Sequence, residues 1–142
     1  MRWITRHRGF TLIELMMALA IIAILVTTAY GGYSRQITES RRAEGRRALL
    51  EVAAKQEQFY LDYGFYTSDL TRLGYDADPL VTEHGYYRIT ATVQNQNQTF
   101  LLTATRQNAQ ADDDQCGNLT VNNFGVRSAT DADDPKPHIN CW

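Results

Sequence analysis

The sequence predicts an α+β fold in which one long N-terminal α-helix packs on a small antiparallel β-sheet. Residues 34–63 carry apolar and neutral side chains at three- and four-residue steps, the period of an amphipathic helix. This stripe consists of Leu49, Val52, Ala53, Gln56, Tyr60 and Tyr63. Two later segments, 86–93 and 99–105, are rich in aromatic and β-branched residues, and the polar run 94–98 separates them as in a β-hairpin. One stripe of the helix is therefore available to cover the sheet.

An uncharged segment precedes the amphipathic half of the helix. Leu15 to Tyr30 are sixteen residues without a charge. Counted from Phe10, the low-charge segment reaches about the 20 residues that a helix needs to cross a bilayer core. Glu14 stands at its head, and a carboxylate in a membrane helix costs roughly 2.5–3.5 kcal/mol and usually marks a specific partner. We expect residues 10–33 to form a transmembrane segment in which Glu14 has a specific role.

Glycines divide the chain further. Gly31 and Gly32 together cost a helix about 2 kcal/mol relative to alanine, so we expect a kink or a locally melted turn there. Gly64 is a natural helix stop. It leaves the 79 residues 64–142 for the sheet and the C-terminal region, a length at which a single core is marginal.

The two cysteines supply a further constraint. Cys116 and Cys141 are separated by 24 residues, and an even cysteine count in an exported chain predicts a disulfide. Closing a loop of that length stabilises the fold by roughly 3–4 kcal/mol in the chain-entropy model. Free thiols or a metal pair are the alternatives, but no His/Cys ligand spacing supports a metal site.

Shorter elements are also expected beyond the helix. Residues 67–74 are predicted to form a single capped helical turn with Thr67 or Ser68 at its start. Asp78-Pro79 marks a second turn. A second hairpin is expected to pair residues 119–121 with 124–126 around a turn at 122–123.

Four arginines form the densest basic cluster, among three glutamates at positions 39, 44 and 51. The spacings allow intrahelical ion pairs of Arg41 with Glu44, Glu39 with Arg42, and Arg47 with Glu51, which predicts a solvated or inter-subunit charge face. The functional alternative is a contact with anionic lipid head groups or with DNA. The cluster consists of Arg41, Arg42, Arg46 and Arg47.

No catalytic constellation is present in the sequence, so we expect no enzyme activity, no cofactor and no metal. His7, His84 and His138 stand in no Ser/His/Asp, Cys/His or His-x-x-x-His pattern. Two acidic runs offer oxygen ligands for calcium but lack the spacing and glycine of an EF-hand loop, so solvated loops are expected. The runs are Asp112 to Asp114, and Asp131, Asp133 and Asp134.

The N-terminus carries a specific motif. Gly9-Phe10-Thr11-Leu12-Ile13-Glu14, with Arg8 just upstream, resembles the class III signal of type IV pilins. The resemblance implies a leader of residues 1–9, cleavage between Gly9 and Phe10 by a prepilin peptidase, and N-methylation of Phe10. It also implies that Glu14 pairs with an N-terminal amine, in its own chain or in a neighbouring one, when subunits pack through residues 10–33 as a filament core. The alternative is an ordinary membrane anchor or a signal peptide cut after Ala29.

The C-terminal part resembles PilE-type minor pilins. The resemblance rests on residues 66–74, 116–122 and 125–127 and on Cys141-Trp142. It implies the type IV pilin fold and a structural pilus subunit, most plainly a minor pilin that acts in pilus assembly and so in twitching motility, adhesion or DNA uptake. A pseudopilin of a type II secretion system and a DNA-binding competence pilin are the alternatives. The implied partners are other pilins, the prepilin peptidase/methyltransferase and the inner membrane.

Charge orients the chain. The three leader arginines favour a cytoplasmic N-terminus, which puts the C-terminal domain on the other side of the membrane. The resemblance to type IV pilins implies that this domain lies in the periplasm of a Gram-negative bacterium and then joins an extracellular pilus. Without the leader the chain keeps 11 basic and 16 acidic residues, a net charge of −5. That balance does not suggest a general polyanion binder.

Overall fold

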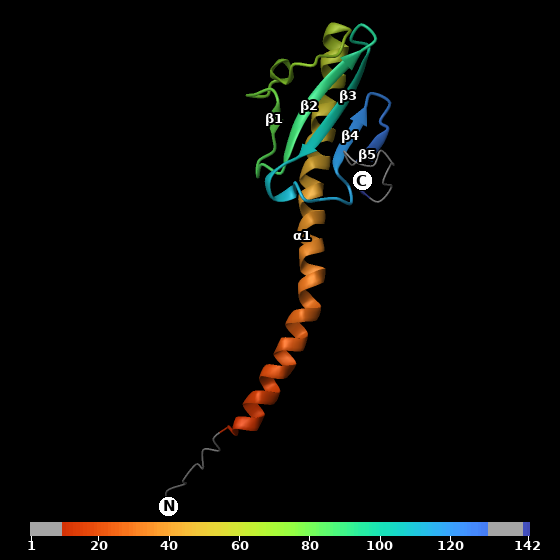
Figure 1. Cartoon of the computed structure of the whole chain (residues 1–142). Coiled ribbons are helices and arrows are strands. Elements are labelled where there is room, and N and C mark those ends of the chain that lie inside the picture. The colour runs from red at the N-terminus through yellow and green to blue at the C-terminus, as the bar shows by residue number, and fades with distance from the viewer. Residues whose placement is uncertain (1–9, 131–140) are drawn as a thin grey trace, which may run out of the picture. The chain divides into compact units, whose positions relative to one another are not determined.

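The computed structural model describes residues 10–130, 141 and 142, without the side chains of residues 28–32 and 130. The chain forms two units, Met1–Ile37 and Thr38–Trp142, and helix α1 contributes to both. The element order is α1 (Leu12–Tyr63), the 3-10 helix η1 (Leu70–Leu73), β1 (Leu80–Val81), β2 (Tyr87–Gln94), β3 (Thr99–Arg106), the 3-10 helix η2 (Asn108–Gln110), β4 (Asn118–Asn122) and β5 (Arg127–Thr130). Figure 1 labels α1 and the strands β1 to β5.

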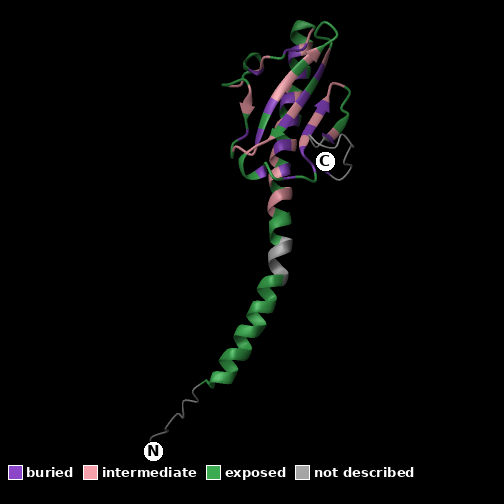
Figure 2. Cartoon of the chain, viewed as in Figure 1, coloured by how far each residue is buried: buried purple, intermediate pink, exposed green. Residues whose placement is uncertain are grey.

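The first unit consists of the N-terminal part of α1. Its large apolar side chains between Phe10 and Val26 are all more than half exposed, which Figure 2 shows as a continuous exposed stretch. Over the described residues, no helix has the length and apolarity of a membrane span. Helix α1 continues through Gly31 and Gly32, so the locally melted turn expected there is wrong, whereas a kink stays a prediction.

The second unit is a five-stranded antiparallel sheet with the C-terminal part of α1 against one face (Figure 1). The strands follow the order β1-β2-β3-β4-β5, so each strand pairs with its neighbour in sequence. Ile89 pairs with Ala104, Ala104 with Leu119, and Leu119 with Ala129, and all four are fully buried. The sheet thus presents one apolar face to the helix, which confirms the predicted α+β fold.

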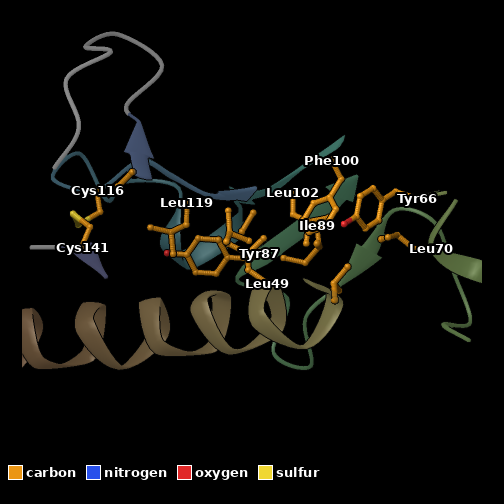
Figure 3. Close-up of a cluster of buried hydrophobic side chains, with 14 residues drawn as sticks. Leu49, Tyr66, Leu70, Tyr87, Ile89, Phe100, Leu102, Cys116, Leu119 and Cys141 are labelled. Atoms are coloured by element: carbon orange, nitrogen blue, oxygen red, sulfur yellow. A yellow bond between two sulfur atoms is a disulfide. The ribbon is translucent and has the colours of Figure 1, made fainter. Parts of the chain in front are cut away.

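The core lies between α1 and this face (Figure 3). Leu49 and Val52 of the predicted helical stripe are fully buried, but Tyr63, which was expected in the same stripe, is 60% exposed. Gly45 has a close-packing role, because a Cβ placed there would lie 2.8 Å from the Tyr87 ring. The absence of a side chain at this position lets the helix approach the sheet.

The first predicted hairpin is confirmed and the second is shifted. Strands β2 and β3 pair over their whole length, whereas residues 124–126 form the turn between β4 and β5 rather than a strand. The side-chain oxygen of Asn122 accepts hydrogen bonds from the amides of Phe124 and Val126, each at 3.0 Å, and Gly125 has φ +74°. These contacts favour a wide turn over continued pairing.

Two shorter elements also depart from expectation. The cap of η1 is Asp69 rather than Thr67 or Ser68, and its carboxylate accepts a hydrogen bond from the Thr71 amide. Gly74 ends the turn as expected. Strand β1 was not predicted; its two residues pair with β2 directly after Asp78-Pro79.

The disulfide between Cys116 and Cys141 is confirmed. Two further contacts fix the described C-terminal residues. Arg46 Nη1 donates to the Cys141 carbonyl at 3.1 Å, and Trp142 Nε1 donates to the Ser128 carbonyl at 2.8 Å. The end of the chain is therefore tied both to α1 and to β5.

Candidate assembly and binding surfaces

The predicted assembly residues stand at the start of α1. Phe10 is 86% exposed, and Glu14 lies in the first helical turn. The Thr11 hydroxyl accepts a hydrogen bond from the Glu14 amide at 3.4 Å, which makes Thr11 the N-cap. The spacing of Thr11 and Glu14 is that of a capping box, which gives Glu14 a local role at the helix start. The assembly role of Glu14 stays a prediction. Gly9 and the leader lie outside the described residues.

Most of the arginine cluster is engaged within its own chain. Arg41 Nη1 donates to the Ala109 carbonyl at 2.8 Å, and its guanidinium lies 4.9 Å from the centre of the Tyr86 ring. Arg46 pairs with Glu39 at 2.8 Å. Arg47 is exposed. The cluster therefore serves mainly to fasten α1 to the rest of the second unit, and its contact with DNA or lipid stays a prediction.

Arg42 forms a buried bidentate ion pair with Asp113, which sequence reasoning placed in a solvated loop. Arg42 Nη2 lies 2.6 Å from Asp113 Oδ1 and Nε lies 2.7 Å from Oδ2. The two side chains are 9% and 2% exposed. Burial alone would raise the pKa of Asp113, but the hydrogen bonds and charge of Arg42 outweigh burial and hold that pKa below its ordinary value. Gln110 Nε2 also donates to Asp113 Oδ2 at 2.7 Å, so this carboxylate organises the β3–β4 connection.

Where the structure describes them, the other polar residues singled out in the sequence form no group that could hold a metal ion. His84 is 62% exposed and its Nδ1 lies 2.8 Å from Glu44. Asp112 and Asp114 are exposed. Within residues 10–130 and 141–142, no three His, Cys, Asp or Glu side chains are grouped closely enough to hold a metal ion. His138 and the acidic run that begins at residue 131 lie outside the described part of the chain.

The outward face of the sheet has an unusual composition. Alternation along the strands places twelve described residues of β2 to β5 on the face away from α1. None is a carboxylate, although the chain has 16 acidic residues. Arg88 is the cation among them, and a row of hydroxyls, Thr90, Thr103, Thr120 and Ser128, crosses four strands in register. The face can therefore donate hydrogen bonds to an anion without carboxylate repulsion.

Together, an exposed apolar helix start with Glu14 in its first turn, and a helix on a disulfide-bonded sheet, define a pilus subunit of the type IV class. Comparison with known proteins agrees. Residues 4–30 match the prokaryotic N-terminal methylation motif. Residues 32–120 match the family described as type IV minor pilin ComP, DNA uptake sequence receptor. The chain belongs to this family of type IV pilins.

Individual relatives carry pilin and fimbrial names. The chain is 32% identical to the type IV major pilin PilA of Myxococcus xanthus over 52% of its own length and 34% of that protein. It is 30% identical to fimbrial protein EcpC of Eikenella corrodens over 70% of its length and 62% of that protein. It is 34% identical to the type IV major pilin PilE of Neisseria gonorrhoeae over 49% of its own length and 42% of that protein. The matches thus span about a third to three fifths of these relatives.

A solved structure supports the fold. A type IV pilin from Shewanella oneidensis superposes with a TM-score of 0.53 and 27% sequence identity, covering 74% of this chain and 97% of that one. The predicted pilin fold is thereby confirmed. The family match also favours the DNA-binding competence pilin, which the sequence had left as an alternative.

Proposed function

We propose that this chain is a minor pilus subunit that takes part in DNA uptake and contacts DNA through the outward face of its sheet. The role is mechanical and associative rather than catalytic. The family match supports the DNA-uptake function. The outward face of the sheet, which has no carboxylate among its described residues, is the structural observation that supports the DNA contact.

Before assembly, the uncharged run Leu15 to Tyr30 holds the precursor in the inner membrane, with its N-terminus in the cytoplasm. Prepilin peptidase then cuts after Gly9, and the new amino terminus at Phe10 is methylated. The exposed apolar side chains of the first unit exchange lipid contacts for contacts with neighbouring helices. Glu14 pairs with an N-terminal amine, which offsets the cost of placing its carboxylate in the filament core.

DNA contact requires donors that reach phosphate oxygens. Arginine, serine, threonine, asparagine and glutamine side chains are among the groups that make such contacts in known complexes. The outward face offers these residue types across adjacent strands, with Arg88 exposed at one end of β2. By contrast, Arg41, Arg42 and Arg46 already donate to acceptors within the chain. The sheet face is therefore a better surface for DNA than the arginine cluster.

Substitution of Glu14 tests the assembly step. We expect Glu14→Ala and Glu14→Gln to reach the membrane and to be cut before Phe10, yet to be depleted from sheared filaments. Glutamine keeps the hydrogen-bonding capacity of a capping box but has no charge. The measurement is the intact mass and amount of the subunit in membrane and filament fractions. Normal incorporation of Glu14→Gln together with loss of Glu14→Ala would assign Glu14 to helix capping alone.

The outward face has its own test. Arg88→Gln is expected to weaken binding to duplex DNA and to reduce the slope of log affinity against log salt by about one. Thr103→Asp, which places a carboxylate in the middle of the hydroxyl row, should weaken binding as well. Ser68→Asp adds the same charge at an exposed position outside the sheet and serves as control. Binding is measured by fluorescence anisotropy at several salt concentrations. Equal affinities for Thr103→Asp and Ser68→Asp would remove the sheet face as the contact.

A further inference from the structure

A groove of about 240 Å³ lies in the second unit between α1 and the segment that includes β1 and the β1–β2 turn. Its helical wall includes Glu44 and Glu51, and its opposite wall includes Tyr75, Val81 and Glu83. Val81 is 47% exposed and gives the groove an accessible apolar surface. The groove is formed by residues that play no part in the proposed assembly step or DNA contact.

The charge of the groove is negative. Three carboxylates line it, with Arg47 and His84 as the basic groups. The surrounding sequence has the same sign, since residues 51–83 contain seven acidic and two basic residues. The net charge of residues 51–83 is therefore −5, which equals the net charge of the whole chain without its leader. The groove therefore adjoins a part of the chain whose negative charge favours a positively charged partner.

The residues of the groove already hold one cation of this chain. The Lys55 ammonium lies 3.8 Å from the centre of the Tyr75 ring and 3.9 Å from Glu51 Oε1. The Tyr75 hydroxyl donates to Glu51 Oε1 at 3.2 Å. An aromatic ring next to a carboxylate attracts a cation through the ring and the charge together. This arrangement shows that the Glu51 and Tyr75 side chains of the groove lining can bind a cation.

One carboxylate of the groove is fixed in place. Glu44 accepts a hydrogen bond from the His84 amide at 3.2 Å, and its other oxygen lies 2.8 Å from His84 Nδ1. Burial would raise the pKa of Glu44, but hydrogen bonds from Thr82 and His84 hold it below its ordinary value. A side chain that is ionised and positioned before binding loses little entropy when a cation arrives.

We propose that this groove receives an arginine or lysine side chain from a neighbouring pilin subunit of another kind in the assembled filament. The aliphatic stem of such a side chain packs on Val81, and its charged head reaches Glu51 and Glu83 at the rim. The proposal rests on the pilus-subunit part of the proposed function and is independent of the DNA contact. In this proposal, the acidic groove of the second unit helps to determine which subunit packs next to it in the filament.

The test uses the full-length chain expressed with its other pilins. Glu51→Gln/Glu83→Gln is expected to lower the amount of subunit in sheared filaments by about threefold to tenfold, the effect of losing two partly exposed ion pairs. Glutamine retains an acceptor for the Tyr75 hydroxyl. Asp76→Asn/Asp112→Asn makes the same change of net charge at exposed positions outside the groove and should leave incorporation unchanged. Equal loss in both double variants would overturn the proposal, since it would reflect net charge alone.

A photo-cross-linking residue at Val81 identifies the occupant. We expect it to attach, in assembled filaments, to a lysine- or arginine-containing peptide of a different pilin, and this product should diminish in Glu51→Gln/Glu83→Gln. A cross-link that is unchanged in the double variant, or one to a peptide without a basic residue, would overturn the proposal. DNA binding of the double variant should remain at the wild-type level, so that failure of the groove and failure of the DNA contact give different results.

Discussion

Replacing both cysteines, as Cys116→Ala/Cys141→Ala, is expected to lower the free energy of unfolding of the second unit by about 3.5 kcal/mol in the chain-entropy model. The bridge closes a loop of 25 residues in sequence separation. Without it, the unfolded chain gains the entropy that the closed loop had removed. The second unit is small enough that this difference is a large fraction of its stability.

Urea unfolding followed by tryptophan fluorescence measures this effect. Once the leader is removed, Trp142 is the one tryptophan left in the chain, and it adjoins Cys141. The wild-type protein unfolded with and without a reducing agent provides the control, because the reduced form should behave like the double variant. A difference below about 1 kcal/mol would fall within the ordinary range for a point substitution. In that case the contacts of Arg46 and Trp142 hold the C-terminus without the bridge.

Features carried by local sequence could be predicted. The hairpin of β2 and β3 follows from β-branched residues around a polar turn, and the disulfide follows from an even cysteine count. The second hairpin was misplaced because the hydrogen bonds to the Asn122 side chain extend the turn to Val126. The second strand therefore begins at Arg127, three residues later than expected. Strand β1 has only two residues and leaves no periodic signal.

Features that depend on distant residues could not be predicted. Helix propensity alone predicts that Gly45 destabilises the helix, yet the absence of a side chain at this position makes room for the Tyr87 ring. Arg42 and Asp113 are 71 residues apart. The local pattern therefore paired Arg42 only with Glu39, a contact that is indeed present at 3.2 Å. The carboxylate-free sheet face likewise becomes visible only when the register of four strands is known.

The Arg42–Asp113 ion pair gives the second large prediction. Arg42→Met is expected to destabilise the second unit by about 3–5 kcal/mol, because it leaves the Asp113 carboxylate buried without its charged partner. Asp113→Asn should lower the free energy of unfolding by less, since Arg42 still forms its ion pair with Glu39, whose side chain is 42% exposed to solvent. Arg42→Met/Asp113→Asn should be less destabilised than the sum of the two single variants. Urea unfolding of all four proteins measures the coupling.

The pH dependence distinguishes an ion pair from simple packing. The native pKa of Asp113 lies below its ordinary value, so the unfolded chain binds more protons below about pH 4. The contribution of the pair is therefore complete above the unfolded pKa and is lost as the pH falls through the lower native pKa. The stability difference between wild type and Arg42→Met/Asp113→Asn should accordingly be constant from pH 7 to about pH 5 and should narrow below about pH 4. A difference that does not change down to about pH 2 would mean that Asp113 contributes through packing and hydrogen bonds rather than through its charge.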